Sequence, residues 1–246
     1  MSLSEIRPIE AESLLFAAGD RNPGPWVAHS LLAGYAAKRI ATADARLNPD
    51  QAFVMGLLHD IGRLYGPSGL RHVTDGYKYL DSLGLRKCAR VSLSHSFPDG
   101  RLDTYLGEPD VEPEDLNLLK AYLQEARFSD YDRLIQLCDF ISDASGYCPV
   151  EVRMVDTVLR HHIKETPHSR WVAVFEILKE FDHRIGTSVY ALLPGIVEST
   201  FGKGDLPRLS ASDPETQSLL AARERFGDPK NWKAAEPQGQ SSQSES

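Results

Sequence analysis

Residues 56–66, GLLHDIGRLYG, place two ionisable side chains, His59 and Asp60, at the end of an apolar run. The surrounding segment, 50–64, is apolar almost all round a predicted helix, which is typical of a central, buried helix. A buried carboxylate is costly unless a cation or several hydrogen bonds meet it. Because Gly62 weakens the helix just after the pair, we expect both side chains at a frayed helix end that faces a cleft.

Helical patterns continue outward from this stretch over most of the chain. Asn48 is the expected N-cap of the central helix, with Pro49 at the first position and Gln51 closing a capping box. Strand-like alternation is weak everywhere, so the sequence predicts an all-α fold, a helical bundle. Other helices are predicted at about 25–45, 72–84, 86–97, 112–126, 129–145, 150–163 and 169–186, while 187–200 is ambiguous.

Composition and charge limit the function classes. The 246 residues carry a formal net charge of −8, which argues against non-specific nucleic-acid binding. Three cysteines without CxxC spacing argue against a disulfide framework and a thiolate zinc site. No apolar run reaches the ~18 residues of a membrane span, and no apolar signal core opens the chain, so we expect a cytoplasmic protein that does not bind membranes.

The sequence divides into four parts by composition. We expect an N-terminal segment at 1–21, the main domain at 22–200, a helical extension at 201–227 and a disordered polar tail at 228–246. The longest internal loop, 98–115, is a candidate lid or binding loop.

Two further ionisable residues lie in apolar helical segments, as the His59–Asp60 pair does. His29 lies on an apolar face of its predicted helix, and Asp139 lies in the apolar run LIQLCDFI. Taken alone, His29 fits a hydrogen-bonded core histidine, and Asp139, on a face with Asp132 and Gln136, fits a solvated helix face. The order H…HD…D together forms a mixed nitrogen and oxygen ligand set, which suits Mn, Fe, Co, Ni, Zn or Mg, as one ion or two.

At these residues the chain resembles the HD-domain superfamily of metal-dependent phosphohydrolases, and more narrowly the bacterial HDIG type. The resemblance rests on WVAHSLLAGYAAKRIA, GLLHDIGRL and LIQLCDFISDAS, and it spans roughly 22–200. It implies an all-helical HD-domain fold in which His29, His59, Asp60 and Asp139 bind metal.

His72 and His95 lie where dinuclear relatives carry two extra histidines. The spacing from Asp60 to His72 is short, and the second histidine of the HD-GYP type and its GYP string are missing. The two residues are therefore candidates for a second metal or for phosphate binding, beside the alternative of ordinary surface histidines.

Arginines supply candidate phosphate contacts. Arg63, three residues after Asp60, would clamp a phosphate and stabilise developing charge, and Arg71 is a second candidate substrate contact; ordinary solvated surface is the alternative for both. The histidine-rich run 160–168 is not expected to bind metal, because histidine is favoured at a helix C-terminus.

The sequence thus predicts a metal-dependent phosphohydrolase that cleaves a phosphate ester of a nucleotide or small phosphorylated metabolite. Asp60 or Asp139 would orient the attacking water, and Arg63 would assist catalysis. Two alternatives stay open: a dinuclear iron oxygenase of the HD fold, and a catalytically silent HD-like regulatory or binding module. The expected partner is a small phosphorylated substrate and not a nucleic-acid polymer, with a homodimer as a further option.

Overall fold

A computed structural model describes residues 6–160, 168–201 and 212–228. Within this part of the chain helices dominate, and the one sheet is a two-stranded hairpin, so the all-α prediction is confirmed. The elements in chain order are α1 Pro8–Arg21, α2 Trp26–Ala43, α3 Pro49–Leu58, the 3₁₀ helix η1 Ile61–Tyr65, α4 Arg71–Ser82, α5 Arg86–Ser94, η2 Leu102–Thr104, α6 Pro113–Glu125, α7 Asp130–Ile141, β1 Ser142–Asp143, β2 Gly146–Tyr147, α8 Val150–Arg160, α9 His168–Ile185, η3 Val189–Leu192, α10 Ile196–Phe201 and α11 Pro214–Phe226.

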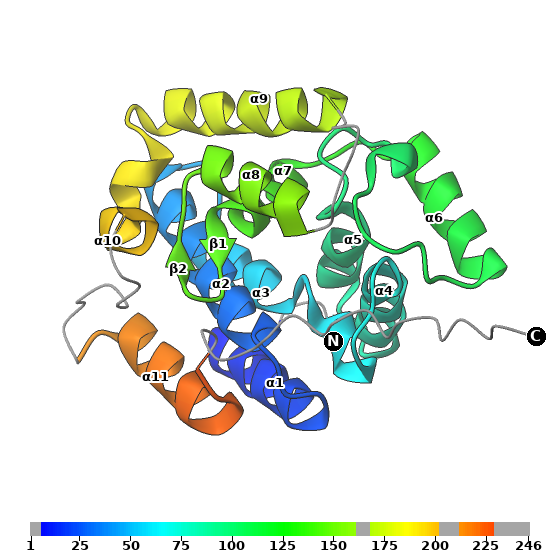
Figure 1. Cartoon of the computed structure of the whole chain (residues 1–246), viewed down its shortest axis with the longest axis horizontal. Coiled ribbons are helices and arrows are strands. Elements are labelled where there is room, and N and C mark those ends of the chain that lie inside the picture. The colour runs from blue at the N-terminus through cyan, green and yellow to red at the C-terminus, as the bar shows by residue number, and fades with distance from the viewer. Residues whose placement is uncertain (1–5, 161–167, 202–211, 229–246) are drawn as a thin grey trace, which may run out of the picture.

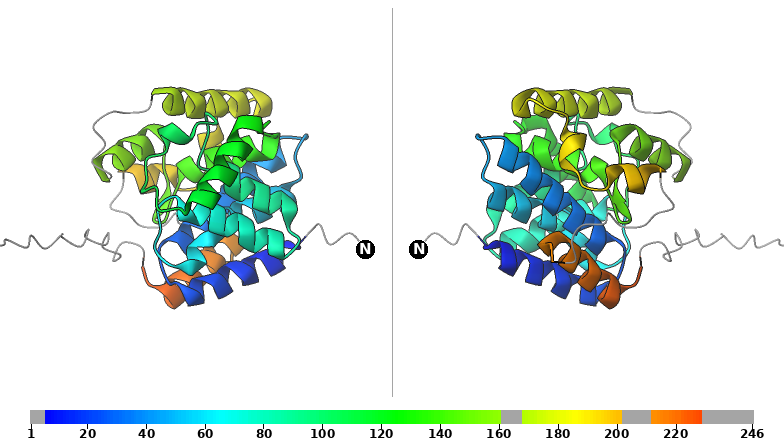
Figure 2. Two further views of the ribbon diagram at one scale, coloured as in Figure 1. Left: turned by 90° about the vertical axis from the view of Figure 1, so that its right-hand side faces the viewer. Right: turned by 90° about the vertical axis from the view of Figure 1, so that its left-hand side faces the viewer.

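Helices α2 and α3 lie at the centre of the bundle. In Figure 1, α9 runs across one end of the molecule, while α1 and α11 close the opposite end; Figure 2 shows the same arrangement from both sides. Helix α2 packs against α3, α7 and α11, and α3 also packs against α1 and α5. Every residue of α3 from Ala52 to Leu58 is buried, as its apolar sequence predicts.

Local sequence signals set several helix ends. Asn48 accepts a hydrogen bond from the Gln51 backbone N–H at 2.9 Å, which confirms the predicted N-cap. The reciprocal half of the capping box does not form, because the Asn48 N–H donates to the Tyr131 hydroxyl instead. Gly84 has a φ of +75° just after α4, where a left-handed residue ends the helix.

Three expectations were wrong. The helix expected over 50–64 ends at Leu58, and η1 follows it. The helix expected over 129–145 ends at Ile141, and residues 142–147 form the β1–β2 hairpin. The expected solvated face of that helix is buried: Asp132 and Gln136 are fully enclosed because they form hydrogen bonds with α5 and its C-terminal turn.

Other segments were predicted without a defined structure or lie outside the described residues. Within the segment expected only as an N-terminal stretch, α1 packs on α3, and its buried residues join the main core. The ambiguous stretch 187–200 contains η3 and most of α10. Residues 229–246 and 161–167, which hold the expected tail and most of the histidine-rich run, lie outside the described residues. Among the described helices, none is both long enough and apolar enough to cross a bilayer.

Candidate metal centre

Close contact between α2 and α3 brings His29 near His59. A Cβ on Gly56 would lie 2.6 Å from the Gly34 Cα and 2.8 Å from the Ala33 carbonyl oxygen. No side chain could occupy that space, so glycine at this position allows the two backbones to touch. His29 lies one and a half turns before this contact on α2, and His59 follows it at the end of α3.

A second close contact explains Gly62. A Cβ there would lie 2.0 Å from the His72 carbonyl oxygen and 2.5 Å from the Gly76 backbone nitrogen. Glycine at this position therefore allows η1 to pack on the backbone of α4, which carries His72 in its first turn. Helix α5 packs on α4 in turn and ends at His95, its C-cap. Within the HDIG string, Gly62 thus allows close backbone packing, and His59 and Asp60 are the candidate ligands.

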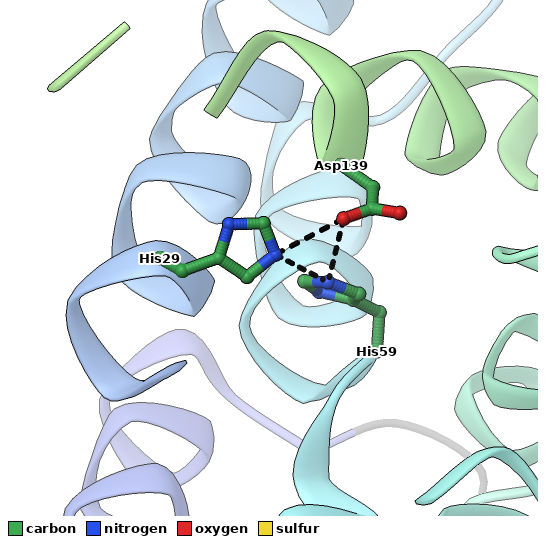
Figure 3. Close-up of side chains that lie close together, drawn as sticks. All are labelled: His29, His59 and Asp139. Carbon is green, nitrogen blue, oxygen red and sulfur yellow. Dashed lines mark hydrogen bonds and ion pairs between the residues drawn. The ribbon is translucent and has the colours of Figure 1, made fainter. Parts of the chain in front are cut away.

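The first group of converging side chains consists of His29, His59 and Asp139, from α2, the end of α3 and α7 (Figure 3). The His29 Nε2 atom lies 3.1 Å from the His59 Nε2 atom and 3.1 Å from the Asp139 Oδ1 atom. His59 Nε2 lies 3.8 Å from the same Asp139 oxygen. Three atoms that could each ligate a metal therefore face one another.

The second group surrounds Asp60 and shares His59 with the first. The Asp60 Oδ1 atom lies 3.2 Å from His72 Nε2 and 3.5 Å from His95 Nε2, and these two nitrogens are 3.3 Å apart. All six predicted candidates thus come together, and we refer to His29, His59, Asp60, His72, His95 and Asp139 as the six-residue cluster.

One hydrogen-bonding rule holds for all four histidines of the cluster. Each Nδ1 atom lies within hydrogen-bond distance of a backbone carbonyl oxygen, which can only accept. The pairs are His29 with Ser142, His59 with Gly56, His72 with Gly69 and His95 with Ser92. Nδ1 therefore carries the proton in each ring, and in a neutral ring the Nε2 atom turned toward the cluster is a lone pair.

Burial keeps two of these rings neutral at ordinary pH. Burial lowers the pKa of His59 to about 4, although the Asp60 carboxylate opposes this shift. Burial and the nearby Arg63 guanidinium lower the pKa of His72 to about 3. The cluster interior therefore presents lone pairs rather than N–H donors from these rings.

The two carboxylates are ionised. Burial favours the protonated form of Asp60, but the charge of the Arg63 guanidinium prevails and holds the pKa of Asp60 well below its usual range. Burial has the same effect at Asp139, where the hydrogen bond and charge interaction with His29 prevail, so that the pKa of Asp139 is lowered.

The donor set fits a metal ion. Acceptor atoms facing one another at 3.1–3.3 Å repel unless a cation lies between them, and a proton on one ring would satisfy only part of either group. Ligands that bind one ion through bonds of ~2.0–2.1 Å are separated by about the same 3 Å. The carbonyl bonds to Nδ1 are the outer contacts that orient metal-binding histidines. His29, His59 and Asp139 could hold one ion, and Asp60, His72 and His95 a second.

Arg63 lies at the edge of the cluster. Its Nε atom donates to the Asp60 Oδ2 atom at 2.6 Å, and Nη1 donates to the Ser68 carbonyl oxygen. The Arg63 and Asp139 side chains keep 29% and 23% of their exposure, so the cluster reaches solvent on their side.

The structure does not bring Arg71 to the cluster. Its side chain is 42% exposed and forms an ion pair with Asp75 at 3.5 Å, one turn along α4. It forms no hydrogen bond or ion pair with the six residues in the part of the chain that the structure describes. A substrate-binding role for Arg71 stays a prediction without geometric support.

Some residues that position the cluster escaped the sequence reasoning. Asp132 accepts from Ser94 at 2.7 Å, and Gln136 donates to the Ser94 carbonyl oxygen at 3.0 Å, which ties α7 to the end of α5 beside His95. The Asp110 carboxylate accepts the Gly69 and Arg71 N–H groups and so caps α4. The loop expected as a lid is therefore attached to the helix that carries His72.

A comparison with protein-family models agrees with this geometry. Residues 26–142 match the family described as HD domain, a range that begins with α2 and contains all six residues of the cluster. Searches of curated proteins and of solved structures return no match. The family match does not distinguish the HDIG type, and α8 to α11 lie beyond it.

Proposed function

Residues 26–142 of this chain belong to the HD domain family, and from that premise we propose that the protein is a metal-dependent phosphohydrolase. Its substrate would be a phosphate ester of a nucleotide or of another small phosphorylated metabolite. The observation that carries the proposal is the convergence of four imidazoles and two carboxylates with their acceptor atoms inward. Burying these acceptor atoms face to face is unfavourable unless a cation lies between them.

We propose two ions as the full complement. One would be held by His29, His59 and Asp139, and the other by Asp60, His72 and His95. Four imidazole ligands favour Mn, Fe, Co, Ni or Zn over Mg, because Mg prefers oxygen ligands. Bound divalent ions would supply a hydroxide nucleophile near neutral pH and neutralise charge on the phosphoryl oxygens.

The chain's own residues complete the site. Asp139, partly exposed at the edge of the cluster, would orient a water molecule through its carboxylate. Arg63 holds the Asp60 carboxylate in place, and its Nη2 end forms no hydrogen bond with the described residues. Because a guanidinium stays protonated, Arg63 would contribute charge to phosphate binding and not proton transfer.

A second candidate function has a specific observation in its favour. All six candidate ligands of a dinuclear centre come together, which also suits an HD-fold oxygenase with two irons. Elemental analysis that finds two irons per chain, with a mixed-valent iron signal in aerobically purified protein, would favour this alternative over hydrolysis. The third alternative, a silent binding module, is opposed by the complete ligand set.

The remaining expectations on the protein's surroundings stay proposals. We propose a small phosphorylated substrate, no nucleic-acid polymer and no membrane as partners, with a homodimer as an option. A cytoplasmic location is proposed on the same footing.

The first experiment is elemental analysis of protein purified without chelator, with His59→Ala as the test variant. His59 would bind the first ion and also lies within ligand distance of Asp60 and His95, so its loss is expected to remove the first ion and weaken binding of the second. His183→Ala is the matched control, because His183 is an exposed histidine on α9. Two equivalents of metal in the wild type and the control, with a large loss in His59→Ala, support the site.

A screen of phosphate esters with the identified metal then tests the reaction. No bound metal in wild-type protein, even after incubation with divalent ions, would contradict the enzyme proposal. In that case the cluster would have to be explained as a set of buried hydrogen bonds.

A further inference from the structure

A buried arginine outside the family match has no carboxylate partner. Arg170, in the first turn of α9, is 7% exposed, and no carboxylate of the described residues lies within 4 Å of its guanidinium. Its Nη1 donates to the Ser96 carbonyl oxygen, its guanidinium lies over the Phe140 ring, and its Nε has no hydrogen-bond partner. A buried charge without a counter-charge is unfavourable in the protein alone.

Another arginine of the same helix shows the ordinary arrangement. The Arg184 side chain is 5% exposed and forms ion pairs with Asp44 at 2.6 Å, Asp130 at 2.9 Å and Glu180 at 3.2 Å. Arg184 is therefore a structural arginine, surrounded by the anions that its burial requires. Arg170 is also buried, but none of the described carboxylates lies at ion-pair distance from it.

Arg170 lies beside the six-residue cluster. Ser96, which accepts its hydrogen bond, follows His95 directly, and Phe140, which lies under its guanidinium, follows Asp139 directly. Burial lowers the pKa of Arg170, although the charges of Asp139 and Asp99, neither of which forms an ion pair with it, oppose this shift. The guanidinium therefore contacts the residue that directly follows a candidate ligand at the end of α5 and the residue that directly follows another in α7.

Tyr105 lies close enough to Arg170 and to Arg63 for both charges to act on its hydroxyl group. It comes from the loop after η2, its ring contacts Phe97, and both arginines and Asp60 act on its hydroxyl group. Burial raises the pKa of Tyr105, so its hydroxyl stays protonated and can donate. The hydroxyl has no hydrogen-bond partner among the described residues.

We propose that the Arg170 guanidinium and the Tyr105 hydroxyl form an oxyanion site that holds the phosphate group of the substrate beside the six-residue cluster. This inference rests on the proposed function, because it assigns substrate recognition in the same site. The site takes a dianionic phosphate group. The formal charges of Arg63, Arg170, Asp60 and Asp139 sum to zero, so each divalent cation in the cluster adds two positive charges to the net charge, and such a site favours a dianion over a monoanion such as acetate.

The unusual position of Arg170 is visible in the sequence. Arg170 shares the buried face of α9 with Val174, Ile177 and Phe181, so it is a charged residue on an apolar face, as His29 is. The difference is that Arg170 lies beyond the HD domain match. The chain would thus use its C-terminal part to complete substrate recognition.

Calorimetric titration of metal-loaded protein with inorganic phosphate tests the site directly. The variants are Arg170→Gln, Arg170→Lys and Tyr105→Phe, with Arg133→Gln as control, because Arg133 pairs with Glu180 and forms no hydrogen bond or ion pair with the six-residue cluster in the described part of the chain. Loss of a charge-assisted hydrogen bond predicts roughly 10- to 100-fold weaker phosphate binding in Arg170→Gln. Arg170→Lys is expected to retain part of the affinity, Tyr105→Phe to lose less, and the control to match the wild type.

A stability measurement separates a binding role from a structural one. In metal-free protein Arg170→Met is expected to keep or raise the Tm, because it removes an uncompensated buried charge. Arg184→Met is expected to lower it, because it removes the buried cation that joins Asp44, Asp130 and Glu180. A fall of the Tm in Arg170→Met as large as that in Arg184→Met would show that Arg170 is structural and would overturn the inference.

The outcomes distinguish this inference from the proposed function. Wild-type protein with its full metal content that binds no phosphate overturns the inference, as does Arg170→Gln that binds phosphate normally or a site that takes acetate as well as phosphate. The phosphohydrolase proposal would then still stand on its metal and activity measurements. Phosphate binding that depends on Arg170, without hydrolysis of any ester, contradicts the proposed reaction and supports the inference.

Discussion

Replacing Gly56 by alanine should separate the two helices that carry His29 and His59. The new Cβ would lie 2.6 Å from the Gly34 Cα and 2.8 Å from the Ala33 carbonyl oxygen, whereas ordinary contact begins at 3.4 Å. The backbones must therefore part by about 0.8 Å, the difference between 3.4 and 2.6 Å. Because both neighbours are backbone atoms, no side-chain rotation can relieve the contact.

The expected loss of stability follows from two opposing effects. Overpacking a tight interface costs ~1–3 kcal/mol, toward the upper end where backbone meets backbone. Alanine also favours the helix over glycine by about 1 kcal/mol. We therefore expect the free energy of unfolding of the metal-free protein to fall by about 2 kcal/mol in Gly56→Ala.

The larger consequence is expected at the candidate metal centre. His29 Nε2 and His59 Nε2 are 3.1 Å apart, and metal ligands tolerate errors of only ~0.2 Å in bond length. A shift of about 0.8 Å between their helices should weaken metal binding by roughly 10- to 100-fold, the range found when supporting residues of a metal site are removed.

Urea denaturation of the metal-free protein and competition with a chelator measure the two effects separately. Gly19→Ala is the matched control, because its Cβ would meet only side-chain atoms of Phe226 and Val27, which can move, on a helix that carries no ligand. The packing argument is refuted if Gly56→Ala keeps its free energy of unfolding to within ~0.5 kcal/mol and its metal affinity to within about 2-fold.

Three further predictions concern acid stability, a helix cap and the metal itself. Because burial lowers the folded-state pKa of His59 from 6.5 to about 4, the unfolded chain binds more protons between these values. Stability should therefore fall as the pH drops from 6.5, by roughly 2 kcal/mol at pH 5 from this residue, and denaturation of His59→Gln should show a weaker pH dependence. Asp110→Ala removes the cap of α4 and should cost ~1 kcal/mol in urea denaturation, whereas Asp103→Ala, at an exposed pair, should change little; equal effects would contradict the capping role. Added Mn²⁺ or Zn²⁺ should raise the Tm of chelator-treated wild-type protein, by ~2.7 kcal/mol of stabilisation at 100 times the Kd, and should leave His59→Ala unchanged; a similar rise in both proteins would point to binding elsewhere.

Local pattern was enough to predict much of the site. His29, His59, Asp60 and Asp139 were recognisable because each is an ionisable residue in an apolar helical segment, a conflict that is visible within a few turns of helix. Arg170 carries the same signal, and it could have been found by the same rule. The HD domain match covers the four residues of the first prediction and also His72 and His95.

Other features depended on contacts between distant segments. Asp132 and Gln136 read as a solvated face because their partners, Ser94 and the end of α5, are about 40 residues away. The sequence predicted Arg71 as a phosphate contact because it adjoins His72. Successive residues of a helix point in different directions, however, and the Arg71 side chain forms an ion pair with Asp75.

The sequence by itself determined an all-helical protein with a buried His–Asp pair, since helix periodicity and the cost of burying charge are local properties. Only the tertiary structure decided that six ligand atoms face inward. That orientation depends on four backbone carbonyls that accept from the Nδ1 atoms, one of which, Ser142, lies 113 residues from its histidine. It also depends on contacts at Gly56 and Gly62 that are possible only because two backbones meet there. Such convergence is a property of chain packing, and no periodicity along the sequence encodes it.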